Sequence, residues 1–439
     1  MGLIHTESWQ RFPINKPMVA SNAGGAALAV SSNYFLTEKE YTVRVASATQ
    51  SIAESSQART YTPRPPVTVA DPVEPDKQRL QWPGNDSTAF YPDNSNTINE
   101  LTYNFAQART HFIVGFLVRA KAGSQKTHSP ESPVNSCQQL SIAPPLTDRY
   151  TNSTTYIGYT MPNTLAQIMA LHTSREKSLM PTANQSRFVD KPTWSFGYEL
   201  PTVPISSEYD TDYFIEIEVD TVNKVLNIWR DDVLVAQPAW QERFYSKLKN
   251  GISFWMGSAV NSGDYLYGNV YGALMISDMY IIDCNDGIAP TTRLGSSTRV
   301  RGEGPNVDVD IDFTRPDGYD SNAAVVSQKV EPGNPTVFLQ ADGDNATDIY
   351  KTDSSNIGQY AGKIYGVTVR TRSANASVSP HNMAIITKDA TTENEINIGQ
   401  FGPTDGFKSG KVVLAKDPSG NEWTVPNAAN LQYGLRVKE

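Results

Sequence analysis

Residues 212–235, with the sequence DYFIEIEVDTVNKVLNIWRDDVLV, constrain the fold more than any other segment of the chain. Aliphatic residues at positions 215, 217 and 219 alternate with three acids: Glu216, Glu218 and Asp220. A period of two places the aliphatic side chains on one face of a strand and the acids on the other. Polar turns at 221–224 and 231–232 then predict two further strands. An antiparallel meander with one buried face belongs to a β-sandwich or a barrel.

The rest of the chain supports an all-β fold. The run His111–Arg119 is apolar on both faces and predicts a central strand that is covered on both sides. Hydrophobic residues make up 39% of the 439 residues, which is enough for sizeable cores in two or three domains. Short helices are expected only at 163–172 and 238–248, where apolar residues share a helical face.

Two segments interrupt the strand pattern. Residues 61–76 contain five prolines and predict a stiff surface loop or a linker. Residues 285–298 contain turn residues without periodicity, which indicates a domain boundary. We therefore expect a first domain at 1–286 and a second, smaller β domain at 287–439.

Charge and cysteine usage exclude several classes of protein. The formal net charge is −9, whereas a nucleic-acid binder usually carries a basic stripe. Nucleic acid is therefore not an expected partner. No apolar window approaches the length that spans a bilayer, so membrane insertion is not expected either. Cys137 and Cys284 are the only cysteines, which indicates two reduced thiols in a protein made in a cytosol; one long-range disulfide is the alternative.

One acidic segment is a candidate metal site. Asp342, Asp344 and Asp348 occupy positions 1, 3 and 7 of a calcium-type loop, and calcium prefers such hard oxygen ligands. An EF-hand would have Gly at the sixth position and Glu at the twelfth, where this chain has Thr347 and Asp353. The alternative is an acidic turn between strands, in which case no cofactor is needed.

Four aromatic residues are candidates for binding a glycan, because sugar rings stack on flat aromatic faces. Three of them flank a polar loop at 258–264, and the fourth lies in another loop-rich stretch: Trp255, Tyr265, Tyr267 and Trp194. The alternative is that these rings anchor a core or a subunit interface, where aromatic residues are also enriched.

The second half of the chain carries longer motifs. They are YLYGNVYGALMISDMYIIDCNDG, RLGSSTRVRGEGPNVDVDIDF, GKIYGVTVRTRSANAS and KDPSGNEWTVPNAANLQYGLRV. In this order they resemble tail-associated virion proteins of double-stranded DNA bacteriophages that have a concanavalin A-like (laminin G-like) first domain. The resemblance covers residues 212–439. It includes a Leu-Gly-x-x-x-Arg-Val entry into the second domain, at Leu294–Val300 here.

The resemblance implies a fold and a role. The fold is a concanavalin A-like jelly-roll sandwich followed by a second, smaller β-sandwich. The role is that of a structural virion protein in the tail, as part of a fibre, a baseplate or a similar external structure, assembled in the cytoplasm of the bacterial host. Its expected partners are other virion structural proteins and further copies of itself. A host-glycan-binding adhesin for host attachment is the first alternative.

A polysaccharide depolymerase is the second alternative. The spacing Glu216-x-Glu218-x-Asp220 is similar to the Glu-x-Asp-x-Glu strand of laminarinase-type glycoside hydrolases. A retaining mechanism needs two carboxyl groups about 5–5.5 Å apart. This chain departs from that motif at its second and third positions, and a solvated strand face that opposes edge pairing explains the same residues. We therefore expect a protein that is not an enzyme.

Overall fold

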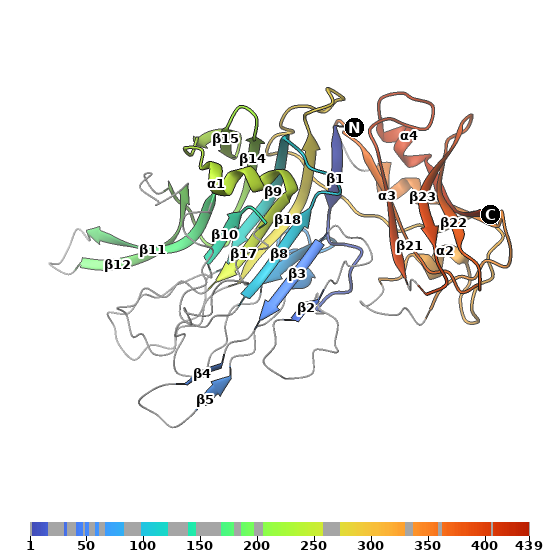
Figure 1. Ribbon diagram of the computed structural model, residues 1–439, viewed down its shortest axis with the longest axis horizontal. Helices are drawn as coiled ribbons and strands as arrows, with labels where there is room; N and C mark the ends of the chain where they lie inside the picture. Colours follow the sequence, from blue (N-terminus) through green and yellow to red (C-terminus); the bar gives the residue numbers. More distant parts are fainter. Residues whose placement is uncertain are drawn as a thin grey trace. The chain divides into compact units, whose positions relative to one another are not determined.

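A computed structural model describes residues 2–15, 30–32, 41–46, 49–51, 58–60, 66–82, 98–121, 139–145, 168–179, 186–196, 205–257, 273–329, 337–358, 362–404 and 407–438 (Figure 1). The chain forms two compact units. The sandwich unit comprises Ile14–Asp278 and Leu294–Thr298, and the C-terminal unit comprises Met1–Pro13, Met279–Arg293 and Arg299–Glu439. The domain boundary at residue 287 stays a prediction. No helix in the described part of the chain is long and apolar enough to cross a membrane.

Two large sheets build the sandwich unit. The first has the strand order β16 (Val233–Ala236), β15 (Val225–Arg230), β14 (Asp212–Asp220), β9 (His111–Ala120), β18 (Leu274–Asp283), β7 (Gln78–Trp82) and β6 (Val67–Ala70). The second has the order β13 (Ile205–Ser206), β12 (Ser186–Phe196), β11 (Met169–Leu179), β10 (Gln139–Ala143), β17 (Gly251–Gly257), β8 (Ile98–Asn104), β3 (Tyr41–Ala46) and β2 (Val30–Ser32). A separate hairpin pairs β4 (Thr49–Ser51) with β5 (Ala58–Thr60).

The two large sheets pack face to face. Phe116 of β9 meets Phe254 of β17 edge-on, with their ring centroids 5.2 Å apart. Both side chains are fully buried and come from different sheets, so this contact lies in the core between the layers. Because Ile215 pairs with Phe116 in register, the aliphatic side of β14 faces this core. The predicted all-β sandwich is confirmed.

The meander at 212–235 forms as the sequence predicts. β14 pairs with β15, and β15 pairs with β16. Asp231 and Asp232 both have positive φ angles, 49° and 67°, as a two-residue turn of type I′ requires. Asp tolerates this conformation better than most residues. The central strand β9 is also confirmed, with residues 112–118 all buried.

Two sequence-based expectations need correction. Residues 67–70 of the proline-rich stretch form the edge strand β6, which pairs with β7 as a hairpin. Its prolines flank the strand at Pro66 and Pro72 and so remove no ladder hydrogen bond from it. The helix expected at 163–172 is also wrong for its described part, because β11 begins at Met169 and pairs along its whole length with β12.

Helical structure elsewhere in the sandwich unit is short. The helix α1 (Glu242–Tyr245) continues into a 3₁₀ turn at Ser246–Asn250. Tyr245 and Leu248 are buried on its inner side, and Trp240 stacks edge-on against Tyr245 with ring centroids 5.7 Å apart. The helix predicted at 238–248 is therefore confirmed, although it is shorter than the pattern indicated.

A five-stranded and a two-stranded sheet build the C-terminal unit. The first has the order β19 (Val307–Ile311), β20 (Thr347–Lys351), β25 (Gln432–Lys438), β22 (His381–Lys388) and β23 (Glu393–Phe401). The second pairs β21 (Val367–Ser373) with β24 (Lys408–Leu414). Short helices are α2 (Asn322–Val326), α3 (Ser354–Gly358) and α4 (Val425–Ala429).

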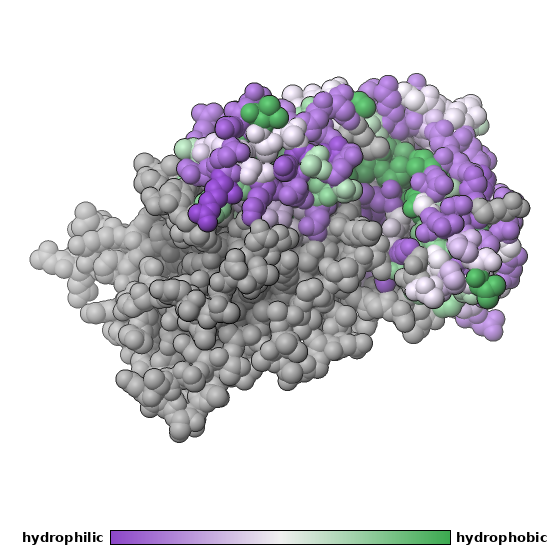
Figure 2. Space-filling model, viewed as in Figure 1, coloured by the Kyte–Doolittle hydropathy of each residue, from purple (hydrophilic) through white to green (hydrophobic). Residues whose placement is uncertain are grey.

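The core of the C-terminal unit gathers side chains from both sheets and from the segment around α4. Val369, Ile385, Val412, Trp423 and Leu431 form its buried centre. Thr424 and Asn427 form a capping box at the start of α4 and so satisfy backbone groups of the short helix. On the face drawn in Figure 2, the coloured surface of this unit is mainly hydrophilic, with hydrophobic colour gathered near α4.

Candidate functional site

The acids predicted as catalytic candidates lie on the outer face of β14. These acids, Glu216, Glu218 and Asp220, alternate with the aliphatic residues that face the core. Asp212, which the sequence did not single out, lies on the same face, with Phe214 between it and Glu216. We call these four residues the acidic row. Its environment decides whether it can act on a substrate, because a nucleophile or a general acid must reach the reacting atoms.

Glu216 is buried, with 1% of its surface exposed. The backbone N–H of Gly295 donates a hydrogen bond to its Oε1 at 3.0 Å. The next residue, Ser296, donates from its backbone N–H to Asp232 at 3.0 Å and from its hydroxyl to the same carboxylate at 2.5 Å. Residues 294–298 are thus fixed across this part of the sheet, and Glu216 is one of the anchors.

Glu218 and Asp220 are engaged as well. Oε1 of Glu218 lies 3.0 Å from Nε2 of His111, and its Oε2 accepts from the Asn227 side chain at 2.9 Å. Asp220 accepts from the backbone N–H groups of Val222 and Asn223 at 2.9 and 2.8 Å. Asp220 therefore closes the 221–224 turn in the way that Asp commonly stabilises turns.

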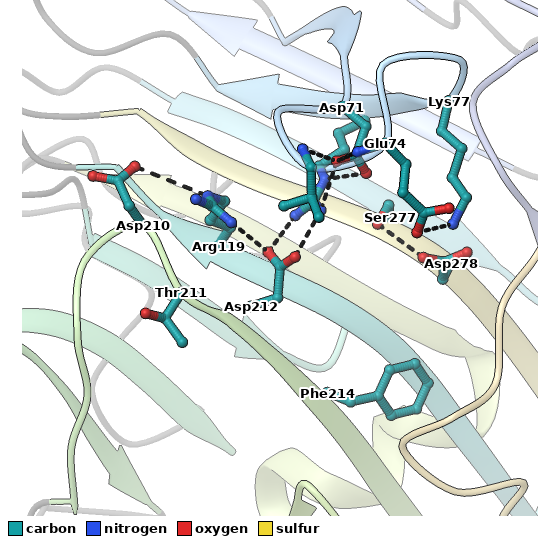
Figure 3. A network of polar contacts seen from close by, with 12 residues as sticks. Asp71, Glu74, Lys77, Arg119, Asp210, Thr211, Asp212, Phe214, Ser277 and Asp278 are labelled. Atoms are coloured by element: carbon teal, nitrogen blue, oxygen red, sulfur yellow. Dashed lines mark hydrogen bonds and ion pairs between the residues drawn. The ribbon is translucent and has the colours of Figure 1, made fainter.

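The first member of the row, Asp212, belongs to a buried charge network around Arg79. Arg79 of β7 is 1% exposed and forms two hydrogen bonds to Asp71, of 2.6 and 2.9 Å, and two to Asp212, of 2.5 and 2.8 Å. Arg119 of β9 donates to the same Asp212 at 3.3 Å. Figure 3 shows Asp212 between Arg119 on one side and the Asp71 turn on the other. Such bidentate pairs are the strong form of the arginine–carboxylate contact.

The network shifts the proton affinities of its members. Burial alone would lower the pKa of Arg79, but hydrogen bonds and charges from Asp212 and Asp71 outweigh it and raise that pKa. Burial would raise the pKa of Asp71, and its hydrogen bonds from Arg79, Val73 and Glu74 hold it below the ordinary 3.8. Both groups are therefore charged at neutral pH and hold β6–β7 to β14.

The acidic row is thus a hydrogen-bonded support rather than the solvated strand face that alternation alone indicates. The structure brings Glu216, Glu218 and Asp220 onto one face, as predicted, and gives each of them protein partners. The sequence did not reveal that His111 lies beside Glu218, nor that Arg79 and Asp71 form a network with Asp212. Arg79 and Asp212 are 133 residues apart, and no local pattern reveals such a pair.

The candidate calcium loop is arranged differently from the expectation. Asp348 is fully buried in β20 and accepts from the backbone N–H groups of Asp312 and Phe313, at 2.8 and 2.7 Å, and from the Tyr350 hydroxyl at 2.6 Å. Asp342 and Asp344 are exposed, and Asp344 lies 3.0 Å from His381. Within the described ranges, no three Asp, Glu, His or Cys side chains could hold a metal ion together. The calcium-type arrangement is not formed because Asp348 turns inward.

The aromatic candidates for glycan binding divide into two groups. Trp194 is 1% exposed in β12, so it is a core residue and presents no face to a sugar. The loop expected around it is instead a strand. Trp255 lies in β17, but its side chain falls outside the described residues, as do Tyr265 and Tyr267. Cys137 is also outside them, whereas the Sγ of Cys284 donates to the Thr291 carbonyl oxygen at 3.4 Å.

Comparisons with known proteins identify no family. The sequence matches no protein-family model and no curated protein. Among solved structures, a LamA variant from Z. galactanivorans in complex with laminaritriose and laminaritetraose is 11% identical, with a TM-score of 0.32 over 64% of this chain and 98% of that one. A GH131 β-glucanase catalytic domain from Podospora anserina is 12% identical, with a TM-score of 0.27 over 46% of this chain and 71% of that one. Alginate lyase Aly36B is 11% identical, with a TM-score of 0.25 over 46% and 79%. At these values the similarity carries no argument about activity.

Proposed function

We propose that this chain is a structural component of a bacteriophage virion, attached to the tail, that works by binding copies of itself and neighbouring virion proteins. The resemblance of residues 212–439 to tail-associated virion proteins supports the virion role. The environment of the acidic row supports a role without catalysis, because Glu216 is buried and accepts from Gly295, and Asp212 is ion-paired with Arg79.

The observation that carries the self-association is the edge strand β16. Edge strands that stay unpaired are usually protected by charges, prolines or bulges. Three edges whose side chains are described follow this rule: β6 is flanked by prolines, β19 has a bulge between two aspartates, and β23 carries paired glutamates. β16 has neither a charge nor a proline in its sequence Val-Leu-Val-Ala, and its Val233 and Leu234 are 63% and 45% exposed. Among the described strands it pairs only with β15, and a bulge interrupts that pairing between Leu234 and Ala236.

A short apolar strand with free backbone groups is a template for pairing with another strand. In an assembly of many copies, such an edge extends the sheet from one protein to the next. Weak single contacts of this kind add up through multivalency.

Sedimentation velocity of the purified full chain tests the proposal. We expect oligomers in the wild type and a shift toward monomer in Leu234→Lys, because a charge at the edge opposes pairing. Val222→Lys is the matched control, since Val222 is 69% exposed but lies in the 221–224 turn rather than on an edge. A wild type that stays monomeric, or the same oligomer in wild type and Leu234→Lys, would contradict the assembly role of β16.

A further inference from the structure

The N-terminal strand is an integral part of the C-terminal unit. β1 (Leu3–Glu7) pairs antiparallel with the second half of β18, with Leu3 opposite Ile282 and Thr6 opposite Tyr280. The backbone N–H of Asp283 donates to the Gly2 carbonyl at 2.6 Å. Residues 2–13, which we call the strap, therefore contribute a strand to a unit whose remaining residues begin at 279.

Side chains attach the strap to β21 and β24 as well. The hydroxyls of Thr6 and Thr368 are 2.8 Å apart. Arg370 donates to the Thr6 carbonyl at 3.1 Å, and Lys411 donates to the Ile4 carbonyl at 3.2 Å. Leu3 is buried against Gly366, where a Cβ would come within 2.8 Å of the Leu3 side chain. The strap thus covers apolar surface and is held by cations from both strands of this sheet.

Glu7 is the charged anchor of the strap. Its carboxylate is buried and lies 2.8 Å from Arg11 and 3.9 Å from Arg370. Burial would raise its pKa, but the charges of Arg11 and Arg370 outweigh that effect and lower the pKa from 4.5 to about 2. Glu7 therefore stays ionised in the closed strap over the whole range in which proteins usually work.

His5 is the residue of the strap whose protonation state changes in mild acid. It is 0% exposed, and its Nδ1 lies 3.4 Å from Nη2 of Arg370. The charged groups that face it are Lys411 on β24, Arg370 on β21, Glu7 on β1 and Arg11 just beyond β1. Burial, followed by the charges of Lys411 and Arg370, lowers its pKa well below 6.5, against the opposing effect of Glu7. A proton on His5 would place a third cation beside Arg370 and Lys411.

We propose that the strap is an acid-sensitive clasp, in which protonation of His5 between Arg370 and Lys411 releases β1 from β18 and from the β21–β24 sheet. Release uncovers the apolar surface under Leu3 and the edge of β18, where Ile281 and Ile282 are fully buried while the strap is closed. The clasp is a property of this fold that is independent of the edge strand β16 and of the virion role.

The sign of the effect follows from proton linkage. The released His5 binds a proton near pH 6.5, whereas the closed clasp excludes it. Stability of the closed form is therefore complete above pH 6.5 and declines as the pH falls below it. Protonation of Glu7 also destabilises the closed form, but only below pH 4.5. A loss of stability between pH 6.5 and pH 4.5 therefore reports on His5 alone of these two residues.

Hydrogen exchange of the full chain, followed by mass spectrometry of its peptides, tests the clasp. Exchange times are scaled to the intrinsic rate at each pH. We expect protection of residues 3–7 and 279–283 to fall about tenfold between about pH 7 and about pH 5.5, as release coupled to one proton requires. Protection of β22 should stay constant. Equal protection of 3–7 at both pH values in the wild type would overturn the proposal, whatever the variants show.

Two variants identify the titrating group. His5→Gln keeps a side chain that can accept from Arg370 but takes up no proton, so its clasp should stay closed at about pH 5.5. His381→Gln is the matched control, because His381 faces the carboxylate of Asp344 and its loss should leave the response of residues 3–7 unchanged. If His5→Gln is already open at pH 7, His5→Asn replaces it, because its shorter amide can also accept a hydrogen bond and takes up no proton. A full acid response in the variant used would contradict the role of His5.

Discussion

The backbone N–H of Gly295 donates a hydrogen bond to the buried carboxylate of Glu216, 3.0 Å away. Gly295 has a φ angle of +88°, and a Cβ at this position would lie 3.2 Å from the Asp232 carboxylate. Glu216 and Gly295 thus depend on each other. The carboxylate of Glu216 accepts the hydrogen bond of the Gly295 N–H, and only glycine adopts a positive φ angle of this size at low cost. This contact and the positive φ angle explain why the second position of the Leu-Gly-x-x-x-Arg-Val motif is a glycine.

Disruption of this contact should loosen residues 294–298. We expect Glu216→Ala to lower the free energy of unfolding by about 1–3 kcal/mol, because it removes a buried, charged acceptor from the partly buried backbone N–H of Gly295. Glu216→Gln keeps an acceptor and should cost less. Urea unfolding and hydrogen exchange of the 294–298 peptide measure the two effects. Equal exchange of that peptide in wild type and Glu216→Ala would show that the carboxylate is no anchor.

Arg79 should be the most costly charge to remove from the sandwich unit. Arg79→Met leaves Asp71 and Asp212 facing each other without their shared cation, and breaking a buried pair costs about 3–5 kcal/mol. Arg119→Met is the control, because Arg119 is more exposed and makes longer contacts, of 3.3 Å with Asp212 and 3.9 Å with the exposed Asp210. We expect a loss of about 1 kcal/mol or less there. Chemical denaturation of both variants checks this order, and a reversed order would refute it.

Acid should weaken the same network. The pKa of Asp71 is lowered in the folded state, so its contribution to stability is present above the unfolded value of 3.8 and is lost as the pH falls below it. Arg79 stays charged throughout and adds no pH dependence in this range. Denaturation of wild type and Asp71→Asn between about pH 6 and about pH 3 should give converging stabilities. A constant difference down to about pH 3 is incompatible with the network as described.

Asp348 should matter for folding and not for calcium. Asp348→Asn weakens the bonds from the Asp312 and Phe313 backbone and from Tyr350, and bonds to a charged acceptor are worth about 1.5–3 kcal/mol each. Asp342→Asn, at an exposed position, should be nearly neutral. Thermal unfolding with and without calcium provides the measurement. A rise in Tm on adding calcium that disappears in Asp342→Asn would restore the metal site.

Trp194 should behave as a core residue. Trp194→Ala is expected to cost about 3–5 kcal/mol, as large-to-small substitutions of buried aromatic residues do. Trp194→Phe should cost clearly less because it leaves a smaller cavity. Thermal unfolding of both variants tests this order. Two folded variants with wild-type stability would place the ring at the surface, where a sugar could reach it.

The sequence predicted those elements whose signals are local. The meander at 212–235, the central strand β9 and the turn at 417–420 follow from alternation and turn residues, and all are found. β20 and β23 were missed. β20 begins within the acidic segment that resembled a calcium loop, and the acids and amides of β23 hide its alternation. β11 was mistaken for a helix because apolar positions spaced by three and four also occur in a strand.

The candidate site was harder to predict, because its chemistry depends on tertiary contacts. Alternation placed Glu216, Glu218 and Asp220 on one face correctly. It gave no information on Gly295, His111 or Arg79, which arrive from distant parts of the chain and turn a solvated face into a supported one. Likewise, the burial of Asp348 and Trp194 follows from neighbours that no local pattern contains.

A cryo-electron microscopy reconstruction of phage particles made in cells that produce this chain tests the proposed function most directly. The account predicts several symmetry-related copies on the tail, each with two β units, and with β16 in contact with a neighbouring protein. A particle that lacks the chain, or one in which β16 faces solvent in every copy, would contradict it.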